Sequence, residues 1–153
     1  MILTEDIQRS ADESVLCWLA TSSPTGEPNV SPKEIFACFG DTEIIVANIA
    51  SPRTITNLHH NPRVCLSFIH VFRQKGYQLH GNGDIIREGH DDFDARAEPL
   101  RKIAGVKFPF DTIIRIVIDH ARPIVAPRYV LYPETTEAEQ VESAMELYGV
   151  KPT

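Results

Sequence analysis

The stretch "VANIASPRTITNLHHNPRV" (46–64) decides the fold expected from this sequence. An apolar strand runs directly into a short helix, with Ser51 at the N-cap and Pro52 at the first helical position. The helix ends at Asn61 and Pro62, because a residue before proline avoids the helical region. A helix that follows a strand at once exposes its unpaired N–H groups at the edge of the sheet.

This helix N-terminus has the features of an anion-binding site. Free N–H groups and the positive end of the helix dipole favour a phosphate. Ser51, Arg53 and Thr54 lie in or beside the first turn, and a guanidinium can bind two phosphate oxygens at once. The other interpretation is that Ser51 and Pro52 only start a helix and that Arg53 is a solvated surface charge. These residues alone do not decide between the two.

Polar residues in two neighbouring strands favour the phosphate interpretation. Lys33 interrupts the apolar strand expected at 30–39, which should pair with the strand at 43–49, so its ammonium would reach the same phosphate. Lys75 and Gln78 bring polar groups to the start of a later strand. The alternatives are ordinary ones: a lysine that protects an edge strand from aggregation, and a charged hairpin loop.

The hydrophobic pattern predicts a mainly β (α+β) fold. Strands are expected at 15–22, 30–39, 43–49, 63–71, 77–86 and once or twice within 112–133, and helices at 4–14, after Ser51, at 89–105 and at 135–149. On the strand 30–39, Ile35, Ala37 and Phe39 point to one side and Phe36 and Cys38 to the other, so both faces should be covered. Hairpin connections without regular strand–helix alternation favour a small antiparallel barrel with peripheral helices.

Composition excludes several classes of protein. The chain of 153 residues and 17.2 kDa is the size of a single domain, 1–153. Its net charge is -6 and its 15 Lys and Arg residues are scattered, which argues against a nucleic-acid partner. We expect no membrane partner, because no apolar run approaches the roughly 20 residues of a membrane span. The N-terminus lacks the pattern of a signal peptide, which predicts a cytoplasmic protein.

The cysteines and histidines do not indicate a metal site. Cys17, Cys38 and Cys65 each lie inside an apolar segment, as expected of buried reduced thiols. None of the three has a neighbouring base that would make it a nucleophile. His59 and His60 are adjacent on the short helix and would point about 100° apart. No metal centre is therefore predicted.

Three segments resemble, in order and spacing, a known family. "LATSSPTGEPNVSPKEIF", "IIVANIASPRTITNLHHNPRVCLSF" and "KGYQLHG" look like successive motifs of the pyridoxamine 5′-phosphate oxidase-like FMN-binding split-barrel proteins. The resemblance covers 15–87. It implies a six-stranded antiparallel split β-barrel that forms a homodimer, with FMN in the clefts between the subunits.

The resemblance also implies which residues hold FMN. They are Lys33, Ser51, Arg53 and Thr54 for the phosphate, the backbone of Val46, Ala47 and Asn48 beside the isoalloxazine, and Lys75 and Gln78 against the ring or ribityl chain. After residue 87 the resemblance weakens. True pyridoxamine phosphate oxidases carry a C-terminal segment with Trp and Arg, whereas the only tryptophan here is Trp18, so vitamin B6 oxidation is not expected.

The leading hypothesis is an FMN-dependent oxidoreductase or flavin reductase-like enzyme, with a nicotinamide or small-molecule electron partner. No catalytic residue is predicted, because a flavin supplies its own redox chemistry. One alternative is a non-catalytic flavin-binding or electron-carrier protein. Another is a relative that binds haem or a deazaflavin, for which His70, His80 and His120 would be the haem candidates. Strand histidines of this kind are more often structural than ligands.

Overall fold

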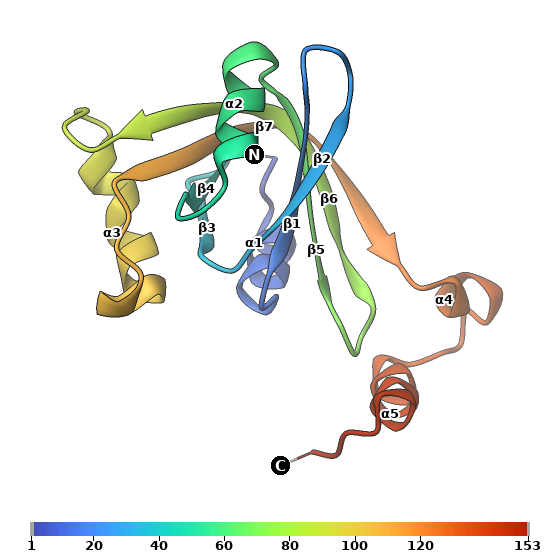
Figure 1. Ribbon diagram of the computed structural model, residues 1–153. Helices are drawn as coiled ribbons and strands as arrows, with labels where there is room; N and C mark the ends of the chain where they lie inside the picture. The colour runs from blue at the N-terminus through green and yellow to red at the C-terminus, as the bar shows by residue number, and fades with distance from the viewer. Residues whose placement is uncertain (1, 153) are drawn as a thin grey trace.

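A computed structural model describes residues 2–152 as one curled antiparallel sheet with helices around it (Figure 1). Within these residues the strand order is β2-β1-β5-β6-β7-β4-β3. The strands are β1 (Cys17–Ser22), β2 (Pro28–Lys33), β3 (Phe36–Phe39), β4 (Glu43–Ala47), β5 (Arg63–His70), β6 (Lys75–Arg87) and β7 (Thr112–Val125). The helices are α1 (Glu5–Asp12), α2 (Pro52–His60), α3 (Phe93–Ala104), the 3-10 turn η1 (Gly105–Lys107), α4 (Pro127–Leu131) and α5 (Glu137–Tyr148). The predicted split β-barrel is confirmed, with seven strands described instead of six.

The two longest strands form the spine of the sheet. β6 pairs with β7 along its whole length, from Lys75 opposite Val125 to Arg87 opposite Thr112. β5 pairs with the first part of β6, whereas β4 pairs with the first part of β7. These two neighbours therefore lie toward opposite ends of the spine. A register shift between His80 and Gly81 marks the point between them, where a bulge increases the twist and helps the sheet to curl.

The strand expected at 30–39 is in fact two strands. β2 pairs with β1, with Lys33 opposite Cys17, while β3 pairs with β4, with Phe36 opposite Val46. The prediction that Lys33 lies on the partner strand of 43–49 was therefore wrong. The chain bends at positions 34 and 35 and crosses from one edge of the sheet to the other. This bend accounts for the extra strand.

The prediction that β3 is covered on both faces is confirmed. Phe36 and Cys38 contact the main core, which α1 closes with Ile7 and Ala11. Ile35, Ala37 and Phe39 instead pack with a second cluster that includes buried residues of α3. α3 is held against the sheet in this way.

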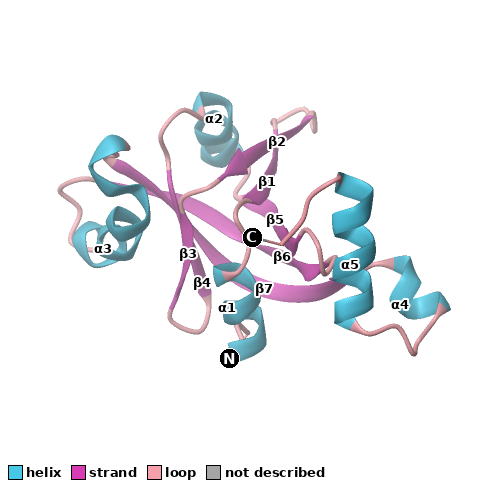
Figure 2. Ribbon diagram, turned by 90° about the horizontal axis from the view of Figure 1, so that it is seen from below, coloured by secondary structure: helices cyan, strands magenta, loops and turns pink. Residues whose placement is uncertain are grey.

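The C-terminal part differs from the expectation in one respect. The segment 112–133 holds a single strand, β7, followed by the short helix α4. α5 begins at a capping box on Thr136 and ends at Gly149, as predicted for 135–149. Its expected apolar face is only partly covered, since Ala144 is buried but Tyr148 is 51% exposed. Both views place α4 and α5 at the opposite end of the molecule from α3 (Figures 1 and 2).

Within residues 2–152, no helix is both long enough and apolar enough to cross a bilayer.

Candidate functional site

A cavity of about 640 Å³ lies between β2, the bend that follows it, the end of β4 and the segment that leads into α2. A volume of this size is typical of small-molecule sites. The polar part of its lining includes Ser31, Lys33 and Ser51, and the apolar part includes Ile35, Ile49, Ile103 and Phe108. A ligand with one anionic end and one flat apolar end matches this division.

Lys33 is the central residue of the polar end. Its side chain is only 6% exposed, and its ammonium contacts the hydroxyl of Ser51. The Ser31 hydroxyl lies 3.4 Å from the same Ser51 oxygen. No carboxylate within residues 2–152 forms an ion pair with Lys33, and burial lowers the pKa of its ammonium. A buried cation without a counter-ion costs several kcal/mol, so this end of the cavity is suited to an anion.

The start of α2 agrees with the prediction and adds a detail. Ser51 is the N-cap and Pro52 follows at the first helical position, but the Ser51 side chain forms no capping hydrogen bond. Its oxygen faces Lys33 instead. The first N–H groups of α2 therefore donate no hydrogen bond to the cap side chain, and a phosphate oxygen is a suitable acceptor for them.

Two buried polar atoms that lie close to Ser51 in the sequence are unpaired within residues 2–152, although neither residue lines the cavity. The hydroxyl oxygen of Thr54 and the amide oxygen Oδ1 of Asn48 are buried and have no hydrogen-bond partner in the described part of the chain. Buried polar atoms in native proteins are almost always paired. A phosphate would accept a hydrogen bond from Thr54, and an O–H or N–H group of the same ligand would donate one to Asn48. The residues present therefore fit a phosphorylated ligand.

Arg53, predicted for the phosphate, and Val46 and Ala47, whose backbone was predicted to border the isoalloxazine, take different positions. Arg53 is 69% exposed and its guanidinium lies 3.9 Å from Glu27, outside the cavity. Val46 points into the main core. Ala47 lines the cavity, but its N–H donates to the carbonyl of Ile35 at 3.0 Å, so its backbone forms a wall without a free donor.

Gln78 does not reach this cavity within one chain. It belongs to a row of paired residues that runs from Pro32 through Trp18 and Ser67 to Gln78. Three interstrand spacings separate its backbone from Pro32, about 14 Å. Side chains also alternate between faces, so Gln78 lies on the opposite face of the sheet from Lys33.

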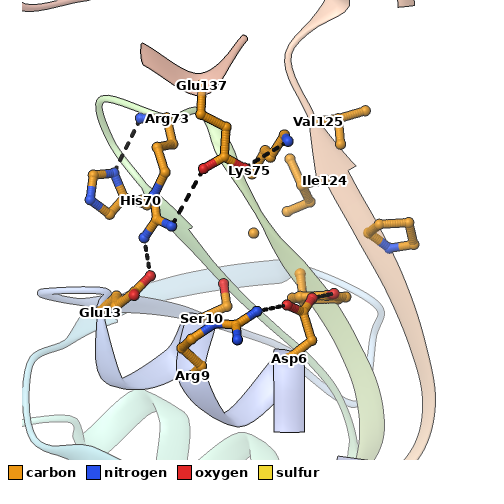
Figure 3. Close-up of a pocket in the computed structure, with 13 residues that line it drawn as sticks. Asp6, Arg9, Ser10, Glu13, His70, Arg73, Lys75, Ile124, Val125 and Glu137 are labelled. Atoms are coloured by element: carbon orange, nitrogen blue, oxygen red, sulfur yellow. Dashed lines mark hydrogen bonds and ion pairs between the residues drawn. The ribbon is translucent and has the colours of Figure 1, made fainter. Parts of the chain in front are cut away.

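Lys75 lies in a different pocket, of about 460 Å³, beside α1 and the start of α5 (Figure 3). Its ammonium is 2.8 Å from a carboxylate oxygen of Glu137. Arg73 lies between Glu137 and Glu13 and pairs with both (Figure 3). Arg9 pairs with Asp6. Since each of these cations already has a carboxylate, the pocket is an ion-pair cluster that attaches α5 to the β5–β6 hairpin.

Removing the charge of Glu137 is expected to loosen α5. Its hydrogen bond with Lys75 lowers the pKa of the Glu137 carboxyl below the ordinary 4.5. The stabilisation is therefore present at neutral pH and is lost as the pH falls through that lowered value. Glu137→Gln removes it at pH 7 and should speed amide exchange in 137–148 by about two- to fivefold, because a partly exposed pair contributes less than about 1 kcal/mol. Exchange unchanged from wild type would contradict this assignment, and Glu142→Gln on the exposed side of α5 is the control.

The fold agrees with the comparisons with known proteins. Residues 3–142 match the family model described as pyridoxamine 5′-phosphate oxidase. The chain belongs to the pyridoxamine 5′-phosphate oxidase family. No curated protein sequence is significantly similar to it.

Solved structures of similar fold come from several bacteria. HupZ from Group A Streptococcus is 21% identical, with a TM-score of 0.67 over 80% of this chain and 98% of that one. An FMN-binding protein from Syntrophomonas wolfei is 17% identical, with a TM-score of 0.68 over 81% and 87%. HutZ, the haem storage protein of Vibrio cholerae, is 20% identical, with a TM-score of 0.59 over 82% and 95%. At these identities the likeness shows the fold alone.

The cysteines are free thiols, as predicted. Burial raises the pKa of Cys17 and of Cys38 to about 12, so neither forms a thiolate at neutral pH. Cys65 is half-buried, and burial also raises its pKa. These thiols do not provide a nucleophile.

The histidines considered for haem have partners within the protein. His80 and His120 face each other with ring centroids 6.0 Å apart, and Nε2 of His120 accepts a hydrogen bond from Arg122 at 2.8 Å. His70 accepts one from the backbone N–H of Arg73, in the pocket beside α5. Across residues 2–152, no group of three His, Cys, Asp or Glu residues is arranged to hold a metal ion.

Several residues that line this cavity were not predicted, among them Ser31, Ile103 and Phe108. Ser31 could have been predicted from the sequence, because it lies two positions before Lys33 on one strand and therefore points to the same face. Ile103 lies near the end of α3, is 52% exposed and lines the cavity, whereas Phe93, Ala97 and Leu100 fill the core beneath the helix. Phe108 follows the helix in an irregular segment, where no periodicity indicates the direction of a side chain.

Proposed function

We propose that this chain binds FMN and acts as an FMN-dependent oxidoreductase or flavin reductase-like enzyme, with a nicotinamide or another small molecule as its electron partner. The observation that carries the proposal is the buried ammonium of Lys33, which faces Ser51 and has no carboxylate partner within residues 2–152. Membership of the pyridoxamine 5′-phosphate oxidase family supports it.

Each polar residue at this end has a role in holding the phosphate. Lys33 would neutralise part of its charge, and the hydroxyls of Ser51 and Thr54 would donate hydrogen bonds to its oxygens. The N–H groups of the first turn of α2 would add to these. Arg53 would provide a second cation by turning away from Glu27, which costs little because that contact is long and exposed.

The part of the cavity lined by Ile35 and Ile49 would hold the flat part of the cofactor. Ile35 and Ile49 offer apolar surface that excludes water. Asn48, which precedes Ile49 but does not itself line the cavity, has an amide oxygen that is unpaired in the described part of the chain. FMN itself would supply the hydride and electron chemistry. The residues of the chain would bind and orient it.

We further propose a homodimer, in a reducing compartment such as the cytoplasm. Lys75 and Gln78 are too far from Ser51 in one chain, so they would join the site only from a second copy. The outer face of the sheet carries large exposed apolar side chains, including Trp18 at 47% and Val30 at 57% exposed, and such patches commonly mark interfaces. The three free thiols agree with reducing conditions.

An FMN titration followed by rapid reduction tests the proposed function. We expect the purified protein to quench FMN fluorescence at a defined stoichiometry, and the bound FMN to be reduced by NADH or NADPH in a stopped-flow experiment. Binding without appreciable reduction by either nicotinamide would instead indicate an electron carrier. A protein that takes up a deazaflavin or haem but no FMN would contradict the proposal.

A further inference from the structure

We propose that the substrate of this site is an uncharged planar aromatic molecule, and that Ile103 and Phe108 select it. The proposal rests on the proposed function, because it assumes that the polar end of the cavity is occupied by the FMN phosphate. It concerns the other end, to which the segment from α3 to the start of β7 contributes.

The charges that this chain brings to the cavity disfavour an anionic group on a substrate bound at the apolar end. Lys33 is the only cation among the lining residues, and the FMN phosphate would engage it. Glu34 is the other charged lining residue and would repel a second anion. A phosphorylated or carboxylated substrate would therefore lose its hydration without gaining a counter-ion from this chain, which is costly.

The apolar lining of this end favours an aromatic ligand. Ile49, Ile103 and Phe108 line it, and they are 48%, 52% and 51% exposed, so large apolar side chains from two separate segments leave uncovered surface at one cavity. Concave apolar surface of this kind is typical of ligand sites, and the Phe108 ring can stack on an aromatic molecule.

Ile103 and Phe108 are well placed to select a substrate, because α3 is held firmly against the sheet. Phe93, Ala97 and Leu100 of α3 are buried in the second core cluster, and the Phe93 ring also contacts Phe110. The chain is therefore packed against the core both before Phe108, in α3, and after it, at Phe110. Val106 lies in the same segment but is 99% exposed and does not line this cavity, so it offers a matched control.

Two probes of the same shape and different charge test the proposal: 2-naphthamide, which is neutral, and 2-naphthoate, which is anionic. Isothermal titration of each into the FMN-loaded protein measures binding without any redox reaction. We expect the neutral probe to bind at least about tenfold more tightly, and Phe108→Ala to weaken it about tenfold, through lost apolar contact. Ile103→Ala should act in the same direction, and Val106→Ala should have no effect. The affinity for FMN should be the same in all of these variants.

The outcomes separate this inference from the proposed function. Wild-type protein that binds no FMN would overturn the proposed function, and this inference with it. If FMN binds but the two probes bind equally or not at all, the substrate class is wrong and the proposed function stands. If Phe108→Ala weakens FMN and leaves 2-naphthamide unchanged, the apolar wall belongs to the cofactor ring and the inference is overturned.

Discussion

Replacing Lys33 with methionine is expected to weaken FMN binding by about 10- to 100-fold and, at the same time, to stabilise the flavin-free protein. The loss of affinity follows from one charge-assisted contact to phosphate, about 1.5–3 kcal/mol. The gain in stability follows from removing a buried ammonium that has no carboxylate partner within residues 2–152. Replacing a buried charge by an apolar side chain of similar length often stabilises by about 1 kcal/mol or more, or about 2–4 °C in Tm.

The difference in stability between Lys33→Met and the wild type, both without flavin, should become smaller as the pH rises. Burial lowers the pKa of Lys33 in the folded protein below its ordinary 10.5. The cost of the buried charge is therefore fully present at neutral pH, and it decreases as the pH rises through the lowered pKa and the ammonium deprotonates. Thermal unfolding of the wild type and of Lys33→Met should give Tm values that converge at alkaline pH.

Lys102→Met is the control for both effects. Lys102 is exposed on α3 and pairs with Glu98, so its loss should change neither FMN affinity nor stability appreciably. If Lys33→Met lowers the Tm of the flavin-free protein and leaves FMN affinity unchanged, Lys33 is a structural residue and its assignment to the phosphate is wrong.

Gly76→Ala is expected to destabilise the fold by about 3 kcal/mol, or about 6–12 °C in Tm. Gly76 lies in β6 between its neighbours Ile69 on β5 and Ile124 on β7. A Cβ atom at this position would be 2.0 Å from the carbonyl oxygen of Phe68 and 2.7 Å from Cα of Ile69. Both are backbone atoms, so the strands themselves would have to move apart. Thermal unfolding of the flavin-free protein measures the effect.

Gly83→Ala on the same strand is the matched control. Its Cβ would approach Cδ2 of Leu58 at 2.8 Å, which is the end of a flexible side chain. We expect a cost of about 1 kcal/mol there, because the Leu58 side chain can adjust. Equal Tm values for Gly76→Ala and Gly83→Ala would show that the close approach of the β5 and β6 backbones at Gly76 does not require a glycine.

The local elements were predictable because their signals lie in neighbouring residues. Ser51, Pro52 and the Asn61-Pro62 pair defined α2 within a few residues, and alternation along 30–39 correctly assigned Phe36 and Ala37 to opposite faces. The proximity of Lys33 to Ser51 was predicted through a wrong strand pairing, but its ammonium does face Ser51. The assignment of both residues to a phosphate stays a prediction.

The long-range features were not predictable from local patterns. No residue pattern within 30–39 shows that the strand is interrupted at Glu34, where the chain crosses the barrel. The interruption depends on the pairing of β2 with β1 and of β3 with β4, which are distant in the sheet. Phe108 reaches the cavity because α3 packs on β3 and β4, which depends on the whole fold. The assignments of Lys75 and Gln78 came from a family motif, and they remain predictions that need a second subunit.

The most direct test of the central claim compares the affinity of the purified protein for FMN and for riboflavin, which differ only in the phosphate. If the phosphate is held by Lys33, Ser51 and the start of α2, FMN should bind at least about 100-fold more tightly, since two or more charge-assisted hydrogen bonds depend on it. Lys33→Met should reduce this ratio and leave riboflavin affinity unchanged. Equal affinities for FMN and riboflavin in the wild type would contradict the account.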